Sequence, residues 1–320
     1  MNDTARDARP LVLADPLPPV FDELAGDRYD VRQFADASGD DLRLAEGMII
    51  YGHHCIDGPL MDRCPSVRVI SNHGVGVDHI DVEAAAQRNI SVGNTPGCLD
   101  ASTADMTMAL MLAVARNIVT GDRFARSERF THYDPAFMIG QEVSGSTLGI
   151  IGMGRIGQQV ARRAAAFDMP VLYHNRNRRP DLEDSLGVGY ASLDELLRQS
   201  DFVSLNCPLT PETTGLISER ELKLMKPSAI LLNLARGPVV NTDALLGALT
   251  SGEIAAAGLD VTDPEPLPRD HPLLTLDNVV IAPHLGSASN RTRRRMMELT
   301  LANLEAGLCG NELPCRVPSR

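Results

Sequence analysis

Three segments in the last third of the chain place side chains that can bind an anion and move a proton directly after apolar runs. These side chains are Arg236 after the run 230–234, Asp260 and Glu265 after 257–259, and His284 after 279–282. A guanidinium binds a carboxylate in a bidentate way, and a histidine beside an acid suits general acid–base catalysis. If the runs are parallel strands, these groups meet at the edge of the sheet where α/β proteins bind ligands.

The elements that must position these groups are strands alternating with helices. Apolar runs bounded by Gly, Pro or Asn predict a first series of strands at 11–13, 48–51, 67–71 and 90–92, and a second at 148–151, 171–173, 202–205, 230–233, 257–259 and 279–282. Between the two series, the pattern predicts one long helix from Ala101 to about Gly121. A chain of 320 residues usually forms more than one domain. The fold class is therefore α/β, with two domains built on parallel sheets.

The second series opens with a glycine motif. The stretch LGIIGMGRIGQQVARRAAAF, residues 148–167, places Gly152, Gly154 and Gly157 in GxGxxG spacing between an apolar strand and an alanine-rich helix. These glycines permit a tight turn, close approach of a pyrophosphate and close packing of helix on strand. Arg155 within the motif can add a contact to phosphate. The alternative is a strand-to-helix turn that binds no ligand.

A basic cluster follows at the end of the next strand, in VLYHNRNRRP, residues 171–180. Many dinucleotide-binding proteins carry an acid there, which binds the ribose hydroxyls and repels a 2′-phosphate. Asn175 and Arg176 stand there instead and predict NADPH, with Arg178 as a further phosphate contact. Arg179 is interpreted as part of a solvated loop.

Composition limits the alternatives. The formal net charge of −12 argues against general binding to nucleic acid or membrane surfaces. The polar N-terminus is unlike a signal peptide, and the stretch Ala104–Ala115 is too short to span a bilayer. The six cysteines show no metal-ligand spacing, so we expect reduced thiols, no metal site and a cytoplasmic protein.

Taken together with SNHGVGVDHIDVEAAAQRNISVGNTPG upstream, these motifs resemble the D-isomer-specific 2-hydroxyacid dehydrogenase family, in its glyoxylate/hydroxypyruvate reductase and 2-ketogluconate reductase branch. The resemblance runs from about residue 48 to about residue 306. It implies Rossmann-like and flavodoxin-like domains with the active site in the cleft between them. Residues 1–100 plus 287–320 would bind substrate, and residues 101–286 would bind NAD(P).

The resemblance also implies roles for individual residues. Arg236 would bind the substrate carboxylate and carbonyl oxygen, and His284 would protonate the ketone oxygen. Glu265 would orient the imidazole and favour its protonated form. The backbone amides of Val75 and Gly76 would hold the carboxylate.

The same resemblance implies a set of coenzyme contacts. Besides Arg236 and His284, the expected cofactor-binding residues are Thr103, Gly152, Gly154, Arg155, Ile156, Gly157, Asn175, Arg176, Arg178, Cys207, Pro208, Thr213, Leu234, Ala235, Asp260 and Gly286. Asp260 would accept a hydrogen bond from the nicotinamide carboxamide. Thr103 has a plainer alternative as a helix cap.

Assembly and pocket size are linked in this resemblance. The resemblance implies a homodimer built around the apolar helix from Ala101, with residues 130–138 reaching the partner's active site. Burial of this helix within one chain is the alternative. Related chains carry tryptophans in this segment, whereas this chain contains no Trp and has Phe130 and Tyr133 there. Met138, His53 and His54 are further candidates near the substrate, the histidines having exposed-loop positions as their alternative.

The sequence thus predicts an NADPH-dependent reductase of small 2-oxoacids such as glyoxylate and hydroxypyruvate, with NADH as a possible second coenzyme. A dehydrogenase for another 2-hydroxyacid, such as D-gluconate or D-lactate, is an alternative. Another is a non-catalytic corepressor that senses dinucleotide. The presence of Arg236, Glu265 and His284 together favours an enzyme, because a sensor needs no proton donor.

Overall fold

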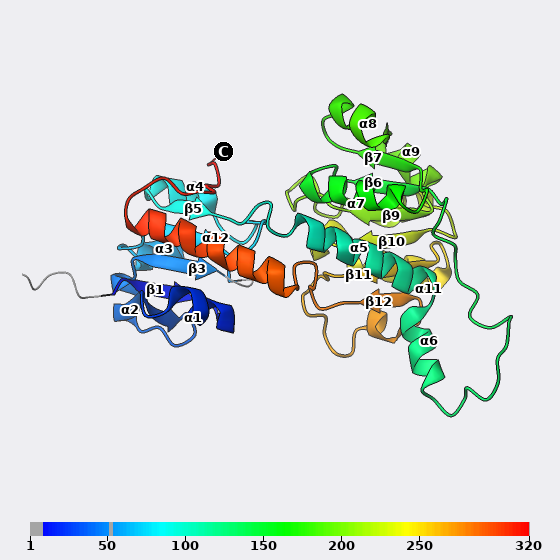
Figure 1. Ribbon diagram of the computed structural model, residues 1–320, viewed down its shortest axis with the longest axis horizontal. Helices are drawn as coiled ribbons and strands as arrows, with labels where there is room; N and C mark the ends of the chain where they lie inside the picture. The colour runs from blue at the N-terminus through cyan, green and yellow to red at the C-terminus, as the bar shows by residue number, and fades with distance from the viewer. Residues whose placement is uncertain (1–8, 51–53, 320) are drawn as a thin grey trace, which may run out of the picture. The chain divides into compact units, whose positions relative to one another are not determined.

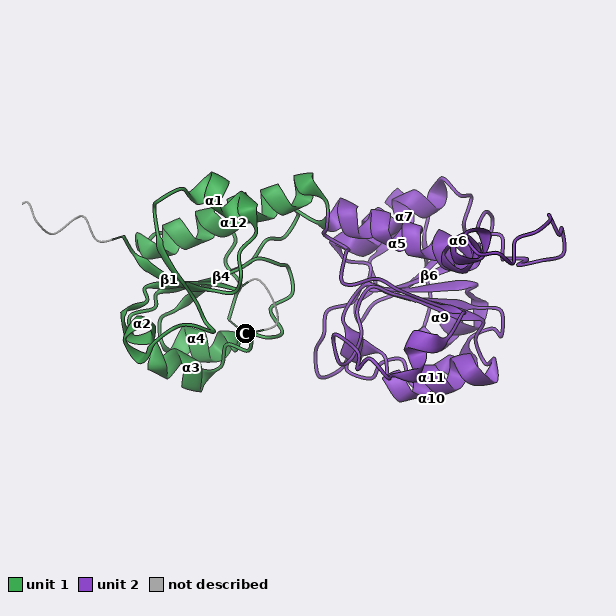
Figure 2. Ribbon diagram, turned by 90° about the horizontal axis from the view of Figure 1, so that it is seen from below, with its two compact units in different colours: residues 1–99, 289–320 green, residues 100–288 purple. Residues whose placement is uncertain are grey.

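A computed structural model describes residues 9–50 and 54–319 of the chain (Figure 1). The chain divides into two compact units, which Figure 2 distinguishes by colour. Unit 1 comprises Met1–Leu99 and Ser289–Arg320, and unit 2 comprises Asp100–Ala288. The sequence-based division placed its boundaries at 100/101 and 286/287.

Unit 1 is a five-stranded parallel sheet with the order β2-β1-β3-β4-β5. Its strands are β1 (Leu11–Ala14), β2 (Asp30–Gln33), β3 (Gly47–Ile50), β4 (Val69–Asn72) and β5 (Ser91–Gly93). Its helices are α1 (Pro19–Ala25), α2 (Gly39–Leu44), α3 (Gly58–Arg63), α4 (Val82–Gln87) and α12 (Asn290–Leu308). Helices α1 and α12 cover one face and α2, α3 and α4 the other (Figure 2). This strand order is the flavodoxin-like one.

Local sequence explains where these helices begin. The side chains of Ser38, Asp57, Asp81 and Ser289 each accept a hydrogen bond from a backbone N–H in the first turn of the helix that follows. Such caps satisfy donors that a helix start leaves without a partner. Strands β3 and β4 are buried along their whole length, as expected for a parallel sheet covered on both faces.

Unit 2 is a seven-stranded parallel sheet with the order β12-β11-β10-β9-β6-β7-β8. Its strands are β6 (Leu148–Ile151), β7 (Val171–His174), β8 (Gly189–Tyr190), β9 (Phe202–Leu205), β10 (Ile230–Asn233), β11 (Ala256–Leu259) and β12 (Val279–Ile281). Its α-helices are α5 (Asp100–Ala115), α6 (Ile118–Ala125), α7 (Arg155–Ala165), α8 (Pro180–Leu186), α9 (Leu193–Gln199), α10 (Glu219–Leu224) and α11 (Thr242–Ser251), with 3-10 helices at Gly237–Val239 and Pro272–Thr275. The chain reverses direction across the sheet between β6 and β9, as in dinucleotide-binding folds.

The two-sheet α/β architecture is confirmed, and the predicted strands are present. Two further strands were missed: β8 is two residues long, and β2, with four residues, has Val31 as its single apolar side chain. The prediction of one helix from Ala101 to Gly121 is wrong. Helix α5 ends at Ala115, and Asn117 takes a left-handed φ of 52° before α6 begins. Asparagine tolerates this conformation better than most residues, and apolar periodicity does not record it.

Among residues 9–50 and 54–319, no helix combines the length and apolar character needed to cross a membrane.

Gly307 should be a sensitive point of unit 1, because α12 returns there from the far end of the sequence to pack on β4. A Cβ added at Gly307 would lie 2.4 Å from Cβ of Val69. We expect Gly307→Ala to lower the free energy of unfolding by about 1–3 kcal/mol through overpacking. Gly247→Ala in α11 is the matched control, since a Cβ there meets nothing within 4 Å. Urea unfolding of both variants is the measurement, and equal stability for the two would contradict the packing described.

Candidate active site

The carboxyl ends of β10, β11 and β12 bring the chemically competent side chains of unit 2 to one edge of its sheet. These three strands are neighbours, with β11 in the middle. Arg236 follows β10, Asp260 is the first residue after β11, and His284 follows β12 closely. The loops after β10 and β11 touch, since a Cβ at Gly237 would lie 1.9 Å from the carbonyl oxygen of Thr262. The parallel topology therefore gathers an arginine, two acids and a histidine, as the sequence predicts.

His284 and Glu265 form the central contact of this edge. His284 Nδ1 lies 2.8 Å from Glu265 Oε1, and both side chains are partly buried. A carboxylate at Nδ1 fixes the orientation of the ring. The ring nitrogen on the opposite side, Nε2, is then the one that faces away from Glu265. This arrangement is suited to delivering a proton from Nε2 to a bound oxygen.

The backbone around His284 is held by Asp260. Leu285 N–H donates to Asp260 Oδ1 at 2.6 Å, and Gly286 N–H donates to Oδ2 at 2.7 Å. His284 N–H also donates to the carbonyl oxygen of Asp260, at 2.9 Å. Burial raises the pKa of the Asp260 carboxyl, and the two backbone donors act in the opposite direction. His284 has a left-handed φ of 55°, and these bonds hold it there.

Arg236 is presented by a turn that Asn233 organises. The amide of Asn233 donates to the carbonyl oxygen of Arg236 at 2.9 Å and accepts from Ala235 N–H at 3.0 Å. Asn233 is buried at the end of β10. Sequence reasoning missed this residue, although its signal is present: a polar amide closes an otherwise apolar strand. Leu234 and Ala235, two of the expected coenzyme contacts, are buried beside it.

The glycine motif has the geometry that a dinucleotide site requires. Gly152 has a φ of +101°, and a Cβ there would lie 2.6 Å from the backbone of Asn206 and Cys207. A Cβ at Gly157 would lie 2.3 Å from the carbonyl oxygen of Gly152. A Cβ at Gly154, the residue before α7, would meet nothing within 4 Å. The turn has no room for a side chain at Gly152 and Gly157, but it leaves space at Gly154 beside the N-terminus of α7. This geometry fits a bound pyrophosphate.

Two residues of the motif contact other parts of unit 2. Arg155 Nε donates to Asp100 Oδ2 at 2.7 Å, and the arginine side chain stays largely exposed. Ile156 is half-buried and packs against the hydrophobic core.

The basic cluster is less uniform than its sequence suggests. Asn175 Oδ1 accepts from Met153 N–H at 2.7 Å, which ties the end of β7 to the glycine turn. Arg178 forms a bidentate pair with Glu183 at 2.7 and 2.8 Å. Arg179 forms a second local pair, with Asp181. Arg176 is exposed, and within the described part of the chain it has no hydrogen-bonding or ionic partner. The structure therefore separates Arg176 from the two arginines that follow it.

The remaining coenzyme candidates lie at the same edge. Thr103 Oγ1 donates to the carbonyl oxygen of Gly286 at 3.3 Å from inside the first turn of α5, so it is not the helix cap. Thr213 Oγ1 donates to the carbonyl oxygen of Pro208 at 2.7 Å and closes the loop after β9. Cys207 lies at the start of this loop, and burial raises the pKa of its thiol to about 11.

The candidate carboxylate loop of unit 1 follows β4 and is held by two asparagines. Asn72 Nδ2 donates to the carbonyl oxygens of Gly74 and Gly76, at 3.1 and 2.9 Å. Asn94 Nδ2 donates to the carbonyl oxygen of Val75 at 2.8 Å. With the carbonyls bound in this way, the N–H groups of Val75 and Gly76 have no partner among the described residues. This loop therefore leaves two adjacent backbone donors available.

Histidines of unit 1 fall into different environments. His73 is buried beside Thr300 of α12, and burial lowers the pKa of its imidazole to about 3, with Arg293 acting in the same direction. His54 is partly exposed, stacks on Phe34 and lies 3.7 Å from Asp15. His53 lies outside the described residues.

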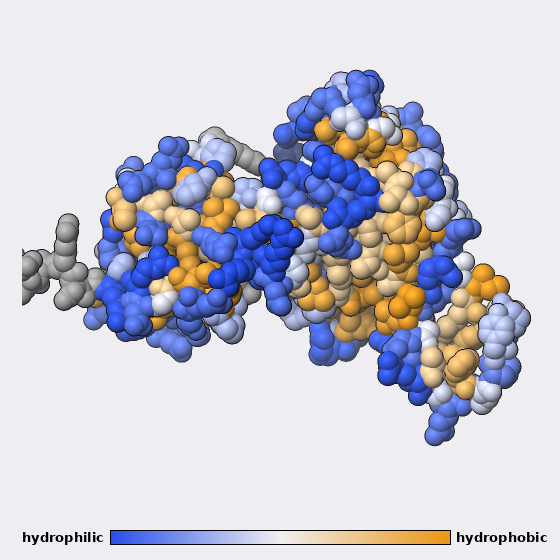
Figure 3. All heavy atoms as spheres, in the orientation of Figure 1, coloured by the Kyte–Doolittle hydropathy of each residue, from blue (hydrophilic) through white to orange (hydrophobic). Residues whose placement is uncertain are grey.

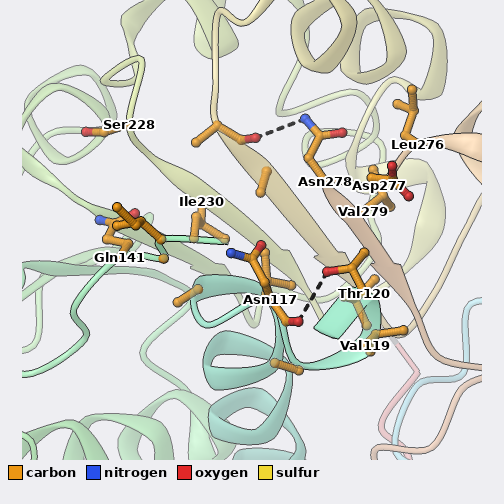
Figure 4. A pocket seen from close by; sticks show the side chains of 18 of the residues that line it. Asn117, Val119, Thr120, Gln141, Ser228, Ile230, Leu276, Asp277, Asn278 and Val279 are labelled. Atoms are coloured by element: carbon orange, nitrogen blue, oxygen red, sulfur yellow. Dashed lines mark hydrogen bonds between the residues drawn. The ribbon is translucent and has the colours of Figure 1, made fainter. Parts of the chain in front are cut away.

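A pocket of about 580 Å³ lies at the opposite edge of the unit 2 sheet, at the amino ends of β10, β11 and β12 (Figure 4). Labelled polar side chains around it include those of Asn117, Thr120, Gln141 and Asn278. Asn278 Nδ2 donates to the carbonyl oxygen of Ala255 at 2.9 Å. Because Arg236, Asp260 and His284 follow the carboxyl ends of the same strands, this pocket is separate from the sheet edge that carries them.

Comparison with known proteins defines the class to which this site belongs. Residues 108–286 match the model of the NAD binding domain of the D-isomer specific 2-hydroxyacid dehydrogenases. The chain belongs to this family and is an NAD(P)-dependent oxidoreductase.

Individual relatives are also similar. A glyoxylate reductase of Korarchaeum cryptofilum is 50% identical over 252 residues, covering 78% of this chain and 76% of that protein. A glyoxylate reductase of Pyrococcus horikoshii is 48% identical over 269 residues, covering 83% and 80%. The structure of an NADPH-dependent glyoxylate/hydroxypyruvate reductase from Sinorhizobium meliloti, in complex with NADP and malonate, has a TM-score of 0.88. It is 33% identical in sequence, and the match covers 97% of each chain.

The thiol of Cys207 provides a check on the environment of the glycine turn. Because its pKa is raised to about 11, little thiolate exists at pH 8. We expect iodoacetamide to alkylate Cys207 more slowly than the exposed Cys309, with the Cys207 rate increasing as the pH rises towards 11. Peptide mass spectrometry at several pH values measures both rates. Alkylation of both cysteines at the same rate at pH 8 would contradict the burial described.

Proposed function

We propose that this chain reduces small 2-oxoacids, glyoxylate and hydroxypyruvate in particular, to 2-hydroxyacids, with NADPH as preferred coenzyme in the cytoplasm. The observation that carries the proposal is the 2.8 Å contact between His284 Nδ1 and Glu265 Oε1, at the sheet edge that also presents Arg236. The activity named for the relatives has the same chemical requirements: an anion site, a proton donor and a nicotinamide coenzyme.

Each candidate residue of the chain has its own role in the proposed reaction. The bound coenzyme supplies hydride to the carbonyl carbon of the substrate. Arg236 binds the carboxylate and carbonyl oxygen, which a planar guanidinium can do with two hydrogen bonds. His284 Nε2 donates a proton to the oxygen as negative charge develops on it, and Glu265 orients the ring for that step. We assign a carboxylate-binding role to the N–H groups of Val75 and Gly76, which have no partner among the described residues.

The other functional classes are weaker. A dinucleotide-sensing corepressor requires the glycine turn, but it does not require a histidine–glutamate pair beside an arginine. D-lactate and D-gluconate differ from the proposed products only beyond the carbon that reacts. Those alternatives therefore concern the far end of the substrate, where hydrogen bonding to a hydroxyl group sets the preference.

The coenzyme preference depends on Arg176. This guanidinium is exposed at the end of β7, and among the described residues no acid pairs with it. Arg178, the second residue expected at the phosphate, is already paired with Glu183. We therefore assign the 2′-phosphate contact to Arg176 and leave Arg178 out of direct contact. NADH remains a second coenzyme.

Assembly as a homodimer is a further part of the proposal. It rests on the exposed segment 118–141 and not on helix α5, on which the sequence-based prediction rests. Met108, Leu110 and Met111 of α5 are buried in the core of unit 2, so this helix has used most of its apolar side chains within one chain. The segment 118–141 instead projects from unit 2 and carries exposed large hydrophobic residues, namely Ile118, Phe130, Tyr133, Phe137, Met138 and Ile139. Apolar side chains gather along it and over neighbouring α5 in Figure 3. We assign a second copy of the chain as the partner that covers this exposed apolar surface.

Substrate preference tests the proposed reaction. We expect kcat/KM for hydroxypyruvate to exceed that for pyruvate about tenfold, since a polar group left without its partner costs about 1–3 kcal/mol. Glyoxylate should also be reduced. The measurement is a panel of 2-oxoacids, each assayed with NADPH and NADH. Pyruvate as good as hydroxypyruvate would assign the chain to a lactate-type activity, and no turnover of any 2-oxoacid would favour the sensor.

The coenzyme assignment is tested at Arg176. Arg176→Ala removes one charge-assisted phosphate contact, worth about 1.5–3 kcal/mol, and we expect kcat/KM with NADPH to fall at least tenfold. The value with NADH should change little, because NADH has no 2′-phosphate. Arg179→Ala, at the arginine paired with Asp181, is the matched control. Equal losses with both coenzymes would remove Arg176 from this role.

Assembly is tested by light scattering at micromolar concentration. We expect a mass of twice 34.5 kDa, and a shift towards 34.5 kDa in Ile139→Asp. Ile139 is 78% exposed, and Leu44→Asp in unit 1, at a residue 65% exposed, is the control that should stay dimeric. An unmutated chain that is monomeric would contradict the proposal.

A further inference from the structure

The basic loop, residues 175–179 between β7 and α8, is tied to the fold at both ends. At its start, the side-chain oxygen of Asn175 accepts from Met153 N–H at 2.7 Å. At its end, Arg179 N–H donates to the hydroxyl oxygen of Tyr173 at 2.7 Å. Arg176 and Asn177 lie between these ties and are exposed. The backbone that carries Arg176 is thus fixed from two sides while its side chain faces solvent.

Tyr173 is the anchor of the second tie. It belongs to β7, its side chain is fully buried, and its ring packs edge-on against Tyr190 of the neighbouring β8, with centroids 5.4 Å apart. Its hydroxyl donates to Glu183 Oε1 at 2.8 Å while accepting from Arg179 N–H. Burial is the largest cause that raises the pKa of this phenol, so the hydroxyl remains a donor throughout the physiological range.

Glu183 extends the anchor from β7 to α8. It accepts from the Tyr173 hydroxyl and, through both oxygens, from the Arg178 guanidinium. These partners lower the pKa of its carboxyl to about 2, with the Arg178 hydrogen bonds as the largest cause. Arg178 in turn lies over the Tyr190 ring, 5.6 Å from its centroid. Arg178 is therefore held within the loop's own scaffold.

We propose that Tyr173 and Glu183 are positioning residues for coenzyme recognition, which hold the basic loop so that Arg176 meets the 2′-phosphate of NADPH. The inference rests on the proposed NADPH preference. It assigns selectivity to a buried phenol and a glutamate that touch no part of the coenzyme, and it gives Arg178 a scaffold role in place of a phosphate contact. Loss of either hydrogen bond makes the loop more mobile in the free protein. Arg176 then loses conformational entropy when NADPH binds, which lowers the affinity for NADPH.

The test compares two ligands that differ only in the 2′-phosphate, adenosine 2′,5′-bisphosphate and AMP, by isothermal titration calorimetry on the full chain. Tyr173→Phe removes one hydroxyl and keeps the ring. We expect it to weaken binding of the bisphosphate about fivefold, which is the effect of one hydrogen bond, and to leave AMP unchanged. Tyr190→Phe removes the neighbouring hydroxyl and keeps the ring that packs on Arg178, so its binding of both ligands should match the unmutated chain.

A double variant connects the tyrosine to Arg176. In an Arg176→Ala background, Tyr173→Phe should have no further effect on the bisphosphate, because the group that it positions is gone. An equal loss in that background, or an equal loss of AMP binding, would overturn the inference. So would unchanged bisphosphate binding in Tyr173→Phe while Arg176→Ala weakens it. If Arg176→Ala itself leaves the two ligands unaffected, the proposed coenzyme preference fails, and this inference fails with it.

Glu183→Gln, on the partly exposed helix α8, provides a second variant. Thermal unfolding shows whether this variant is folded. Simple electrostatics predicts tighter bisphosphate binding when a negative charge near the phosphate is removed. The positioning role predicts weaker binding, because glutamine keeps one acceptor oxygen but replaces the other, which accepts from Arg178, with an NH2 donor. A gain in bisphosphate affinity would therefore contradict the inference directly.

Discussion

The carboxylate of Asp260 holds the part of the molecule on which the chemistry depends. The two carboxylate oxygens accept from the consecutive backbone N–H groups of Leu285 and Gly286 at 2.6 and 2.7 Å. The backbone carbonyl oxygen of Asp260 accepts from His284 N–H. These bonds keep His284 in a left-handed conformation that most residues avoid at a cost of about 1–3 kcal/mol. The orientation of the imidazole towards Glu265 follows from that turn. Asp260 thus has a structural task at the site besides any contact with the coenzyme.

Parallel strand topology explains why the grouping of the candidate side chains could be predicted from sequence. Arg236, Asp260 and His284 each follow the end of an apolar run, and the runs 230–233, 257–259 and 279–282 correspond to adjacent strands. The GxGxxG spacing likewise fixes a local geometry, because only glycine fits at Gly152 and Gly157. Such features are encoded within a few residues, so a single sequence is enough to predict them.

The sequence alone could not predict which side chains form ion pairs with one another. The cluster after β7 reads as several equivalent arginines, but Glu183 and Asp181 pair with Arg178 and Arg179 and leave Arg176 without an ionic partner in the described chain. Two features of the helices were also beyond the sequence: Met108 and Met111 of α5 are buried within unit 2, and Asn117 adopts a left-handed backbone conformation between α5 and α6. Asn233 and Asn72, which organise the turns that carry Arg236 and the pair Val75–Gly76, also act through hydrogen bonds to the backbone that no periodicity records.

The central claim is that His284, held by Glu265 and Asp260, is the proton donor of a 2-oxoacid reductase. His284→Asn measures it most directly, with His271→Asn as the control, since His271 only caps the short helix Pro272–Thr275 and asparagine can replace it there. We predict that His284→Asn lowers kcat for hydroxypyruvate about 100-fold or more while the dissociation constant for NADP⁺ stays within about twofold. The control should retain full activity. A His284→Asn variant that keeps most of its kcat would contradict the claim.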